Sequence, residues 1–447
     1  MESYPIFMGR RTFSRIFGSS ASPILLRPIE RLSPLSLATN ALTERTLLRG
    51  YALAFLLSLG VTVSNSFARM AYALVLPAMR ADLEWNYTQA GWLNTANAIG
   101  YLFGAVLTRM VIRHTGNRTL FVVGVLLTAL SVLATGLTRD IVWLGVWRSA
   151  SGVAGAAAFI AGGALSGNIL PAQPQRAGTT IAIYFGGGGL GFLLCGVALP
   201  LMLDSGGRAA WQHAWVGMGG AGLVMLVACA WAAARIAEPN LAPEGEDAPE
   251  RGSSARLKAG LAAYFMFGLG YIGYMTFVIA WMRDHGAGTG AVIAMWTVFG
   301  VASLLGPWLW RIPLGRWIPG RMLAAALATL ALGALLPLLS AGLVSMLLSA
   351  VLFGASMWNI PGSVTHLVKR ALPKPDWGLT VATFTIFFAA GQIAGPVMTG
   401  ALADAFGGLG IGLAVSVGVL ALGAMIALTQ HDVVHPDAAH ARPRPAL

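Results

Sequence analysis

Two arginines occupy positions where a charged side chain is costly. Arg69 stands eight residues before Pro77 at the end of one apolar run, and Arg148 stands eight residues after Asp140 at the start of another. In a helix rising 1.5 Å per residue, both lie roughly 12 Å inside a bilayer core about 30 Å thick. A guanidinium at that depth costs about 2.5–3.5 kcal/mol, so each should face protein or a water-filled cavity.

Both arginines could bind an anion, because the guanidinium fork matches a carboxylate, sulfonate or phosphate. None of the 17 Asp and Glu residues lies in the middle of an apolar run, so neither arginine has a counter-charge at its own depth. The pattern therefore predicts an anion site. The structural alternative is that one or both guanidinium groups hydrogen-bond to backbone carbonyls.

The elements that must position these residues are membrane helices. Hydrophobic residues make up 56% of the 447 residues and charged residues 10%, whereas soluble domains carry about 25% charge. Crossing a bilayer takes roughly 20 apolar residues in a helix. Such runs occur at residues 50–79, 87–108, 119–138, 141–170, 179–203, 213–234, 259–282, 289–310, 322–339, 341–368, 378–403 and 409–429. We therefore predict an all-α membrane protein with twelve transmembrane helices. The composition excludes a cytosolic enzyme, a disordered regulator and a disulfide scaffold.

The basic residues predict the orientation of the chain. With the N-terminus in the cytoplasm, 23 of the 29 Lys and Arg residues fall on the cytoplasmic side, as the positive-inside rule requires. Both termini are then cytoplasmic. The net charge of +12 belongs to these loops rather than to one patch, so no nucleic-acid partner is expected.

The chain divides into two similar halves. A polar, Pro-rich and acidic segment separates six spans from six, and the motif Met-Arg closes both span 1 and span 7, at 79–80 and 282–283. A repeat of this kind is the architecture of many secondary transporters. The predicted divisions are a cytoplasmic N-terminal extension (1–46), an N-terminal six-helix bundle (47–236), a cytoplasmic linker (237–258), a C-terminal six-helix bundle (259–430) and a cytoplasmic tail (431–447). The extension lacks the apolar segment of a secretory signal peptide.

Several motifs resemble the major facilitator superfamily. They are LPAMRADL at 76–83 with QAGWL at 89–93, the Arg-x3-Gly-x2-Gly-x2-Ala pattern at 148–158, and GQIAGP at 391–396. Within 67–104, the stretches FARMAY and NTANAIGY resemble the YbfB-like bacterial branch of that superfamily. The resemblance implies two pseudo-symmetric six-helix bundles, alternating access and a bacterial cell inner membrane.

The sequence departs from the superfamily pattern at two places. The loop RHTGNR at 113–118 lacks the acidic residue that the superfamily usually carries there. Gly191 is followed by Phe192, whereas drug/proton antiporters typically have Gly-Pro in span 5. The second departure weakens the interpretation as a multidrug efflux protein.

Polar side chains within the spans are the candidates for substrate contact. Asn94 and Asn97 share one face of span 2 and either line a cavity or hydrogen-bond to a neighbouring helix. The resemblance places spans 1, 4, 7 and 10 beside a central cavity, although aromatic residues there could equally be core packing. The predicted substrate-binding residues are Arg69, Tyr72, Asn94, Asn97, Arg148, Tyr271, Tyr274, Trp358, Asn359 and Gln392.

Catalytic, metal and cofactor motifs are absent, so we expect no enzyme activity, no metal site and no cofactor. Gly186-x-Gly188-x-x-Gly191 fits a dinucleotide fingerprint, but it lies inside an apolar span, where small residues favour close helix packing. The histidines His431, His435 and His440 are more typical of a solvated tail than of a metal site.

The sequence thus favours a secondary active transporter of a small organic solute, with an anion as one candidate. Efflux of drug-like compounds or metabolites is the alternative within transport, and a non-transporting membrane sensor on the same fold is the alternative outside it. The expected partners are the lipid bilayer, the small-molecule substrate and a coupling ion. A proton is one candidate ion, carried either through the substrate's own ionisation or by Asp140, Asp404 or His366 at span ends. Facilitated diffusion or ion exchange is the alternative to proton coupling.

Overall fold

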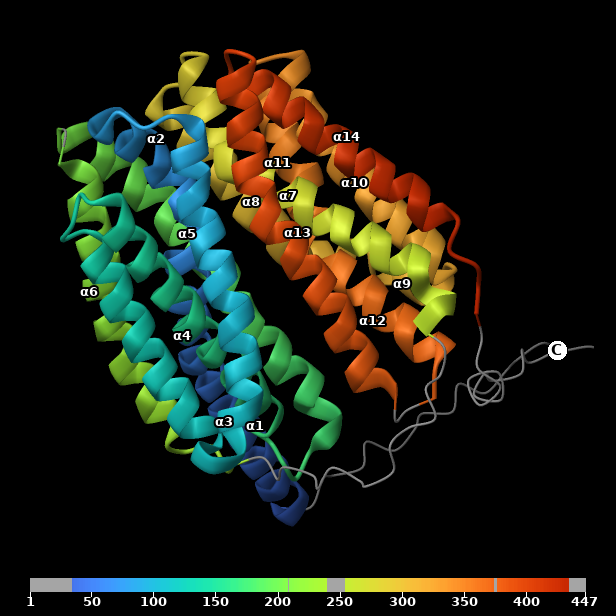
Figure 1. Ribbon diagram of the computed structural model, residues 1–447. Helices are drawn as coiled ribbons and strands as arrows, with labels where there is room; N and C mark the ends of the chain where they lie inside the picture. The colour runs from blue at the N-terminus through green and yellow to red at the C-terminus, as the bar shows by residue number, and fades with distance from the viewer. Residues whose placement is uncertain (1–33, 208, 239–253, 374–375, 434–447) are drawn as a thin grey trace, which may run out of the picture. The chain divides into compact units, whose positions relative to one another are not determined.

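The computed structural model describes residues 34–207, 209–238, 254–373 and 376–433 (Figure 1). The chain forms two compact units, Met1–Thr46 and Leu47–Leu447, and the following description concerns the second. Every regular element in the described residues is helical. This confirms the predicted all-α fold.

The elements of the first half precede the linker. They are α1 (Pro34–Val61), η1 (Thr62–Met70), α2 (Tyr72–Leu83), α3 (Tyr87–Thr135), α4 (Ile141–Gly167), η2 (Pro174–Arg176), α5 (Ala177–Ser205) and α6 (Ala210–Ala233). The elements of the second half are η3 (Ser254–Leu257), α7 (Lys258–Asp284), α8 (Thr289–Leu309), α9 (Arg311–Arg316), α10 (Pro319–Leu339), α11 (Leu343–Met357), α12 (Asn359–Ala371), α13 (Trp377–Ala405) and α14 (Leu409–Leu428).

Spans 2 and 3 are two helices that follow each other directly across a kink, and the label α3 covers both. In the described residues, eleven helices are long and apolar enough to cross a membrane, and one of them is the 49-residue α3. At 1.5 Å per residue α3 is about 74 Å of helix, enough for two crossings. Its backbone breaks at Gly116, with φ of 77° and ψ of 163°. Residues on both sides of the break, Gly104 and Gly124, contact the same stretch of α4, so the chain reverses there.

The reversal at Gly116 is held by an acid from elsewhere in the chain. Glu238 accepts hydrogen bonds from the backbone N–H groups of Asn117 (3.1 Å) and Arg118 (2.8 Å), where the second part of α3 begins. In return, the Arg118 guanidinium donates to the carbonyls of Ala233 (3.0 Å) and Ile236 (2.7 Å) after α6. The acid missing from the loop sequence is thus supplied by the first residues of the segment expected to be a linker.

Two other spans are interrupted. Span 1 runs as α1, η1 and α2, and the nine residues of η1 form a π-helical stretch in which all side chains are buried. Span 10 breaks at Trp358 between α11 and α12. Mid-helix π-helical turns in proteins are frequently found at functional sites.

Each half packs mainly against itself, and the two halves meet chiefly through α3 with α13, α5 with α8, and α2 with α7. In Figure 1 the blue-to-green helices gather on one side and the yellow-to-red helices on the other. Between described residues, side-chain hydrogen bonds join the halves from mid-span, where Arg69 bonds to Gln392, to one end of the helices, where Tyr87 and Thr88 bond to Asp404. We call the end that contains Tyr87, Thr88 and Asp404 the Asp404 end.

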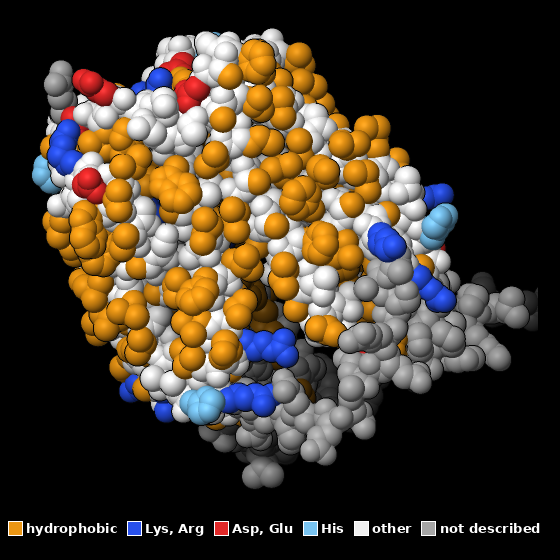
Figure 2. All heavy atoms as spheres, viewed as in Figure 1, with side chains coloured by type: hydrophobic (Ala, Val, Ile, Leu, Met, Phe, Trp, Pro, Cys, Tyr) orange, Lys and Arg blue, Asp and Glu red, His pale blue; other side chains and the backbone are white. Residues whose placement is uncertain are grey.

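The outer surface is apolar. Many large hydrophobic side chains are exposed, including Val224 (74% exposed) and Val227 (72%) on α6. Figure 2 shows hydrophobic side chains across the middle of the viewed face and charged side chains mostly near its ends. An apolar surface this large belongs in lipid, and the protein is a multi-pass membrane protein.

Candidate functional site

Arg69 lies in mid-span, where the two halves meet. It is the penultimate residue of η1, and its side chain is 7% exposed. One guanidinium nitrogen, Nη2, donates to Oε1 of Gln392 on α13 at 2.6 Å. Gln392 in turn donates through Nε2 to the hydroxyl of Tyr271 on α7. Spans 1, 7 and 11 therefore converge on three of the predicted residues.

Aromatic rings line the surroundings of Arg69. Its guanidinium carbon lies 4.6 Å from the centre of the Tyr101 ring, a cation–π contact that no sequence pattern predicted. The Tyr271 ring stacks on those of Phe267 (4.7 Å) and Phe388 (5.7 Å), which also stack on each other (5.2 Å). No described carboxylate forms an ion pair with Arg69.

Arg148 has a more enclosed environment. Its side chain is fully buried, and Nη1 donates to the backbone carbonyl of Ala68 in η1. The guanidinium lies 5.2 Å from the ring centre of Tyr72 and 5.1 Å from that of Trp215. Its Nε and Nη2 atoms have no hydrogen-bond partner among the described residues. Arg148 is therefore bonded to the backbone of Ala68, the residue that precedes Arg69 in the sequence.

The two asparagines of span 2 have different partners. Asn94 donates to the hydroxyl of Thr276 on α7 at 2.6 Å and so joins the two halves. Asn97 donates to the Arg148 carbonyl and to the Ser151 hydroxyl, both at 3.0 Å, within the first half.

The remaining predicted residues have the following contacts, in addition to that of Tyr72 with Arg148. The Tyr274 hydroxyl bonds with Ser349 at 2.6 Å, and Asn359 donates to the carbonyl of Ala355 at 2.7 Å, both inside the second half. Trp358 is partly buried against the hydrophobic core. The Tyr72 hydroxyl donates to the carbonyl of Ala90 at 2.6 Å, which ties span 1 to span 2.

Two polar residues of η1 were not singled out from the sequence. Ser64 Oγ and Asn65 Nδ2 are buried without a hydrogen-bond partner in the described part of the chain. A buried polar group normally has a partner. The signal for them was weak, because Ser and Asn in an apolar run give no periodicity of their own.

A carboxylate closes the Asp404 end. Asp404, at the end of α13, accepts from the backbone N–H groups of Tyr87 and Thr88 at 2.8 Å each and from the Thr88 hydroxyl at 2.6 Å. The Tyr87 hydroxyl donates to Asp284 at 2.8 Å, and Arg283 pairs with Asp204 at 3.0 Å. These bonds connect the start of α3 and the end of α5 to the second half.

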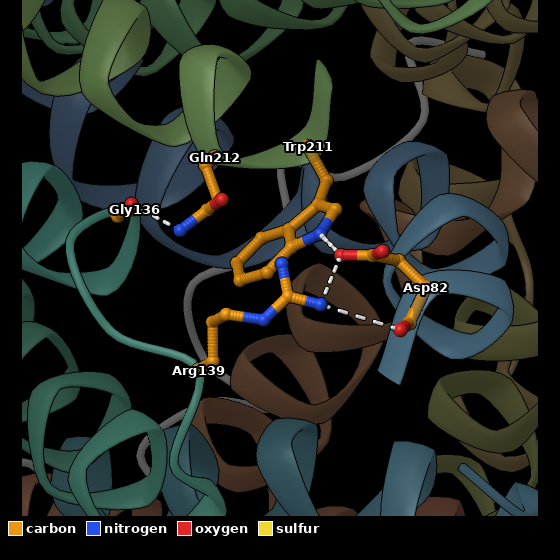
Figure 3. A network of polar contacts seen from close by, with 5 residues as sticks. All are labelled: Asp82, Gly136, Arg139, Trp211 and Gln212. Carbon is orange, nitrogen blue, oxygen red and sulfur yellow. Dashed lines mark hydrogen bonds and ion pairs between the residues drawn. The ribbon is translucent and has the colours of Figure 1, made fainter. Parts of the chain in front are cut away.

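A second polar network braces the same end of the first half. Figure 3 shows Asp82 accepting from the Trp211 indole N–H (2.7 Å) and pairing with Arg139 (2.8 Å), while Gln212 donates to the carbonyl of Gly136 (3.3 Å). The network joins α2, the loop before α4, and α6. It fixes the helix ends against which the second half packs.

The described residues hold no cluster of three or more His, Cys, Asp or Glu side chains suited to a metal ion. Both cysteines, Cys195 and Cys229, are buried and unpaired. The site is therefore one of hydrogen-bond donors, a mid-span cation and aromatic rings.

Comparisons with known proteins agree with this architecture. Residues 61–428 match the family described as the uncharacterised MFS-type transporter YbfB. Proteins from two strains of Mycobacterium tuberculosis, each described as an uncharacterized MFS-type transporter, are 26% identical over 287 residues. That match covers 61% of this chain and spans 62% of the length of each relative.

Solved structures show the same fold. A bacterial homologue of the human lysosomal transporter Spinster, inward-facing and unoccupied, has a TM-score of 0.65 and 17% identity, covering 85% of this chain and 97% of that one. The nucleoside transporter NupG has a TM-score of 0.62 and 14% identity, covering 85% of this chain and 98% of that one. Because the family match extends over most of the described helices, the chain belongs to the major facilitator superfamily, in its YbfB-like branch of membrane transporters.

Proposed function

We propose that the protein is a secondary active transporter that carries a small organic anion by alternating access, with Arg69 as the residue that binds the anionic group. The observation that carries the proposal is the Arg69 environment. The cation is in mid-membrane and pairs with no described carboxylate, and a neutral amide, Gln392 Oε1, accepts from it across the two halves.

The same contact suggests how binding would be coupled to movement. Gln392 belongs to the second half and Arg69 to the first, so an anion that displaces the amide from Arg69 changes a bond between the halves. A ligand shifts a conformational equilibrium only through such a difference in contacts. Arg148, enclosed by Tyr72 and Trp215, supports the backbone of η1 in this arrangement.

The placement in the cell follows from the charge distribution. We infer the inner membrane of a bacterium with both termini cytoplasmic, so that the Asp404 end faces outward and is closed. With this orientation, the hydrogen bonds between the halves at the Asp404 end lie on the outer side of the membrane. A coupling ion, with the proton as one candidate, belongs to the same proposal.

The experiment is a thermal-shift screen of the purified protein against organic anions, cations and neutral solutes. A ligand that binds only the folded protein raises its apparent stability. We expect carboxylates, sulfonates or phosphates among the stabilising compounds, and uptake or efflux of those compounds in proteoliposomes. In Arg69→Gln, their affinity should fall about tenfold to hundredfold, as loss of a charge-assisted hydrogen bond worth about 1.5–3 kcal/mol requires.

Arg139→Gln is the matched control, because Arg139 is a half-exposed arginine at a helix end. It should leave the affinity unchanged. Stabilisation by cations or neutral drug-like compounds, unaltered in Arg69→Gln, would support efflux of such compounds and overturn the anion proposal. Stabilising anions that are not transported in either direction would identify a sensor.

A further inference from the structure

We propose that Ser64 and Asn65 belong to the same binding site as Arg69 and hold a second hydrogen-bond-accepting group of the same substrate. The inference rests on the proposed function and adds a substrate class to it. The substrate would be a small bifunctional anion, with its anionic group at Arg69 and another acceptor, such as a hydroxyl, carbonyl or second carboxylate, about one helical turn or 5 Å away.

The first observation is that these two side chains lack partners although they are enclosed. Ser64 is 4% exposed and Asn65 is 7% exposed, and neither Ser64 Oγ nor Asn65 Nδ2 has a hydrogen-bond partner in the described residues. Leaving a buried donor unsatisfied costs about 1–3 kcal/mol. Two such groups on successive residues therefore indicate a place that water or a ligand fills.

Two neighbouring residues of the same turn do have partners. The hydroxyls of Thr62 and Ser66 donate to the carbonyls of Gly187 and Gly188 on α5, both at 2.8 Å. These bonds anchor η1 to α5. Ser64 Oγ and Asn65 Nδ2 make no such bond in the described residues, although Asn65 also faces Gly188.

Glycines of two neighbouring helices face these two residues. A Cβ atom added at Gly188 would lie 3.7 Å from Asn65 Nδ2, and one added at Gly155 would lie 3.0 Å from the Ser64 carbonyl oxygen. The neighbouring helices α5 and α4 therefore present backbone without side chains toward these two residues. Any larger residue at Gly188 would contact the Asn65 amide directly.

Asn65 and Arg69 lie one turn apart on η1 and have the same small exposure, 7% each. Residues at that separation share a helix face. The atoms without a partner there are Asn65 Nδ2, an N–H donor, and Ser64 Oγ, which can donate, and no described carboxylate is paired to Arg69. Such a set of donors selects a ligand rich in acceptors and disfavours a cation.

Thiol labelling tests the inference without a known substrate. Asn65→Cys would be made in a background lacking the buried native thiols (Cys195→Ala and Cys229→Ala) and purified in detergent, so that both ends are accessible. The reagents are two methanethiosulfonates of similar size, one bearing a sulfonate and one a trimethylammonium group. Ser340→Cys, exposed in the loop between α10 and α11, is the reference thiol.

We expect the thiol introduced by Asn65→Cys to react with both reagents. The ratio of its labelling rate with the sulfonate reagent to that with the trimethylammonium reagent should be about tenfold higher than the same ratio at the reference thiol, because a nearby cation concentrates anions. Adding Arg69→Gln should abolish that preference. Ser64→Cys, a nearly isosteric change, should behave in the same way and serves if Asn65→Cys does not fold.

Each other result has a distinct meaning. If the thiols introduced at positions 64 and 65 react with neither reagent, both residues are sealed in the bundle and the inference is wrong, while the proposed role of Arg69 stands. If they react without a preference for the sulfonate, the site is accessible but does not select anions. That outcome overturns the shared anion site, and the thermal-shift screen then decides the proposed function separately.

Discussion

Arg69 and Arg148 show how two residues of one type, placed at one depth, acquire different surroundings. Arg69 contacts an amide across the halves and keeps a small exposure, whereas Arg148 is fully enclosed and donates to a carbonyl of η1. The contact of Arg148 with the Ala68 carbonyl is the one that the backbone-bonding alternative expects. The anion site at Arg69 stays a prediction, which the labelling and binding experiments with Arg69→Gln test.

At the same scale, Asp82 provides a stability prediction. Asp82→Ala leaves the buried indole N–H of Trp211 without an acceptor and removes the ion pair with Arg139. We expect a loss of about 1–3 kcal/mol, seen as a lower apparent Tm of the purified protein. Arg139→Ala removes the half-exposed partner alone and should cost no more than about 1 kcal/mol. Equal losses in both variants would mean that the indole bond contributes nothing.

Two carboxylates of this protein bind backbone N–H groups at the beginning of helical stretches. Asp404 and Glu238 each accept from two backbone N–H groups where a helical stretch begins, and each comes from a distant part of the chain. A carboxylate at such a position is stabilised by the unpaired N–H groups and by the helix dipole. Asp404 does this between the halves, so the bond must break if the Asp404 end is to open.

Asp404→Asn should therefore shift the protein toward a state open at the Asp404 end. In sealed vesicles, a membrane-impermeant thiol reagent supplied from that side should label Asn65→Cys several-fold faster in the Asp404→Asn background. Asp140→Asn is the matched control, because Asp140 also caps a helix, accepting from Val142 and Trp143 at 3.0 Å each, but within its own half. Equal acceleration by both changes would contradict a role in closure.

The break in α3 supplies a second prediction at this scale. Gly116 has φ of 77° and ψ of 163°, a backbone conformation available almost only to glycine, and a Cβ there would lie 3.3 Å from Glu238 Oε1. Gly116→Ala should cost about 1–3 kcal/mol of stability. Gly178→Ala, in a helix with open space around it, should be neutral or slightly stabilising. Thermal unfolding of both variants measures the difference.

For the whole molecule, the prediction concerns orientation. Because 23 of 29 basic residues fall on one side of the twelve spans, a reporter fused after Asp284 should be periplasmic and one fused after Arg251 cytoplasmic. Alkaline phosphatase and green fluorescent protein fusions at both positions read this out with opposite signals. The reverse pattern at both sites would place the Asp404 end in the cytoplasm and invert the proposed direction of opening.

Composition and patterning determined the class of the protein and nearly every span. Long apolar runs can be stable only as helices in lipid, because every backbone polar group must bond within its own helix. For this reason the membrane fold was predictable from the apolar runs. The superfamily resemblance rested instead on the motifs that contain Pro77, Arg148 and Gln392. The domain boundaries and the orientation stay predictions that rest on that patterning.

The tertiary structure alone decided which polar side chains meet. Arg69 and Gln392 are 323 residues apart, and the carboxylate of Glu238 closes a turn 121 residues away. In an apolar span, Ser, Asn and Gln leave no periodic signal that identifies a partner, since any neighbouring helix can supply one. The π-helical turn of η1 was also invisible, because its energy depends on contacts with α4 and α5 rather than on local propensity. Thus the sequence placed the charges along the spans, and only the packing of distant helices decided which partners each of them has.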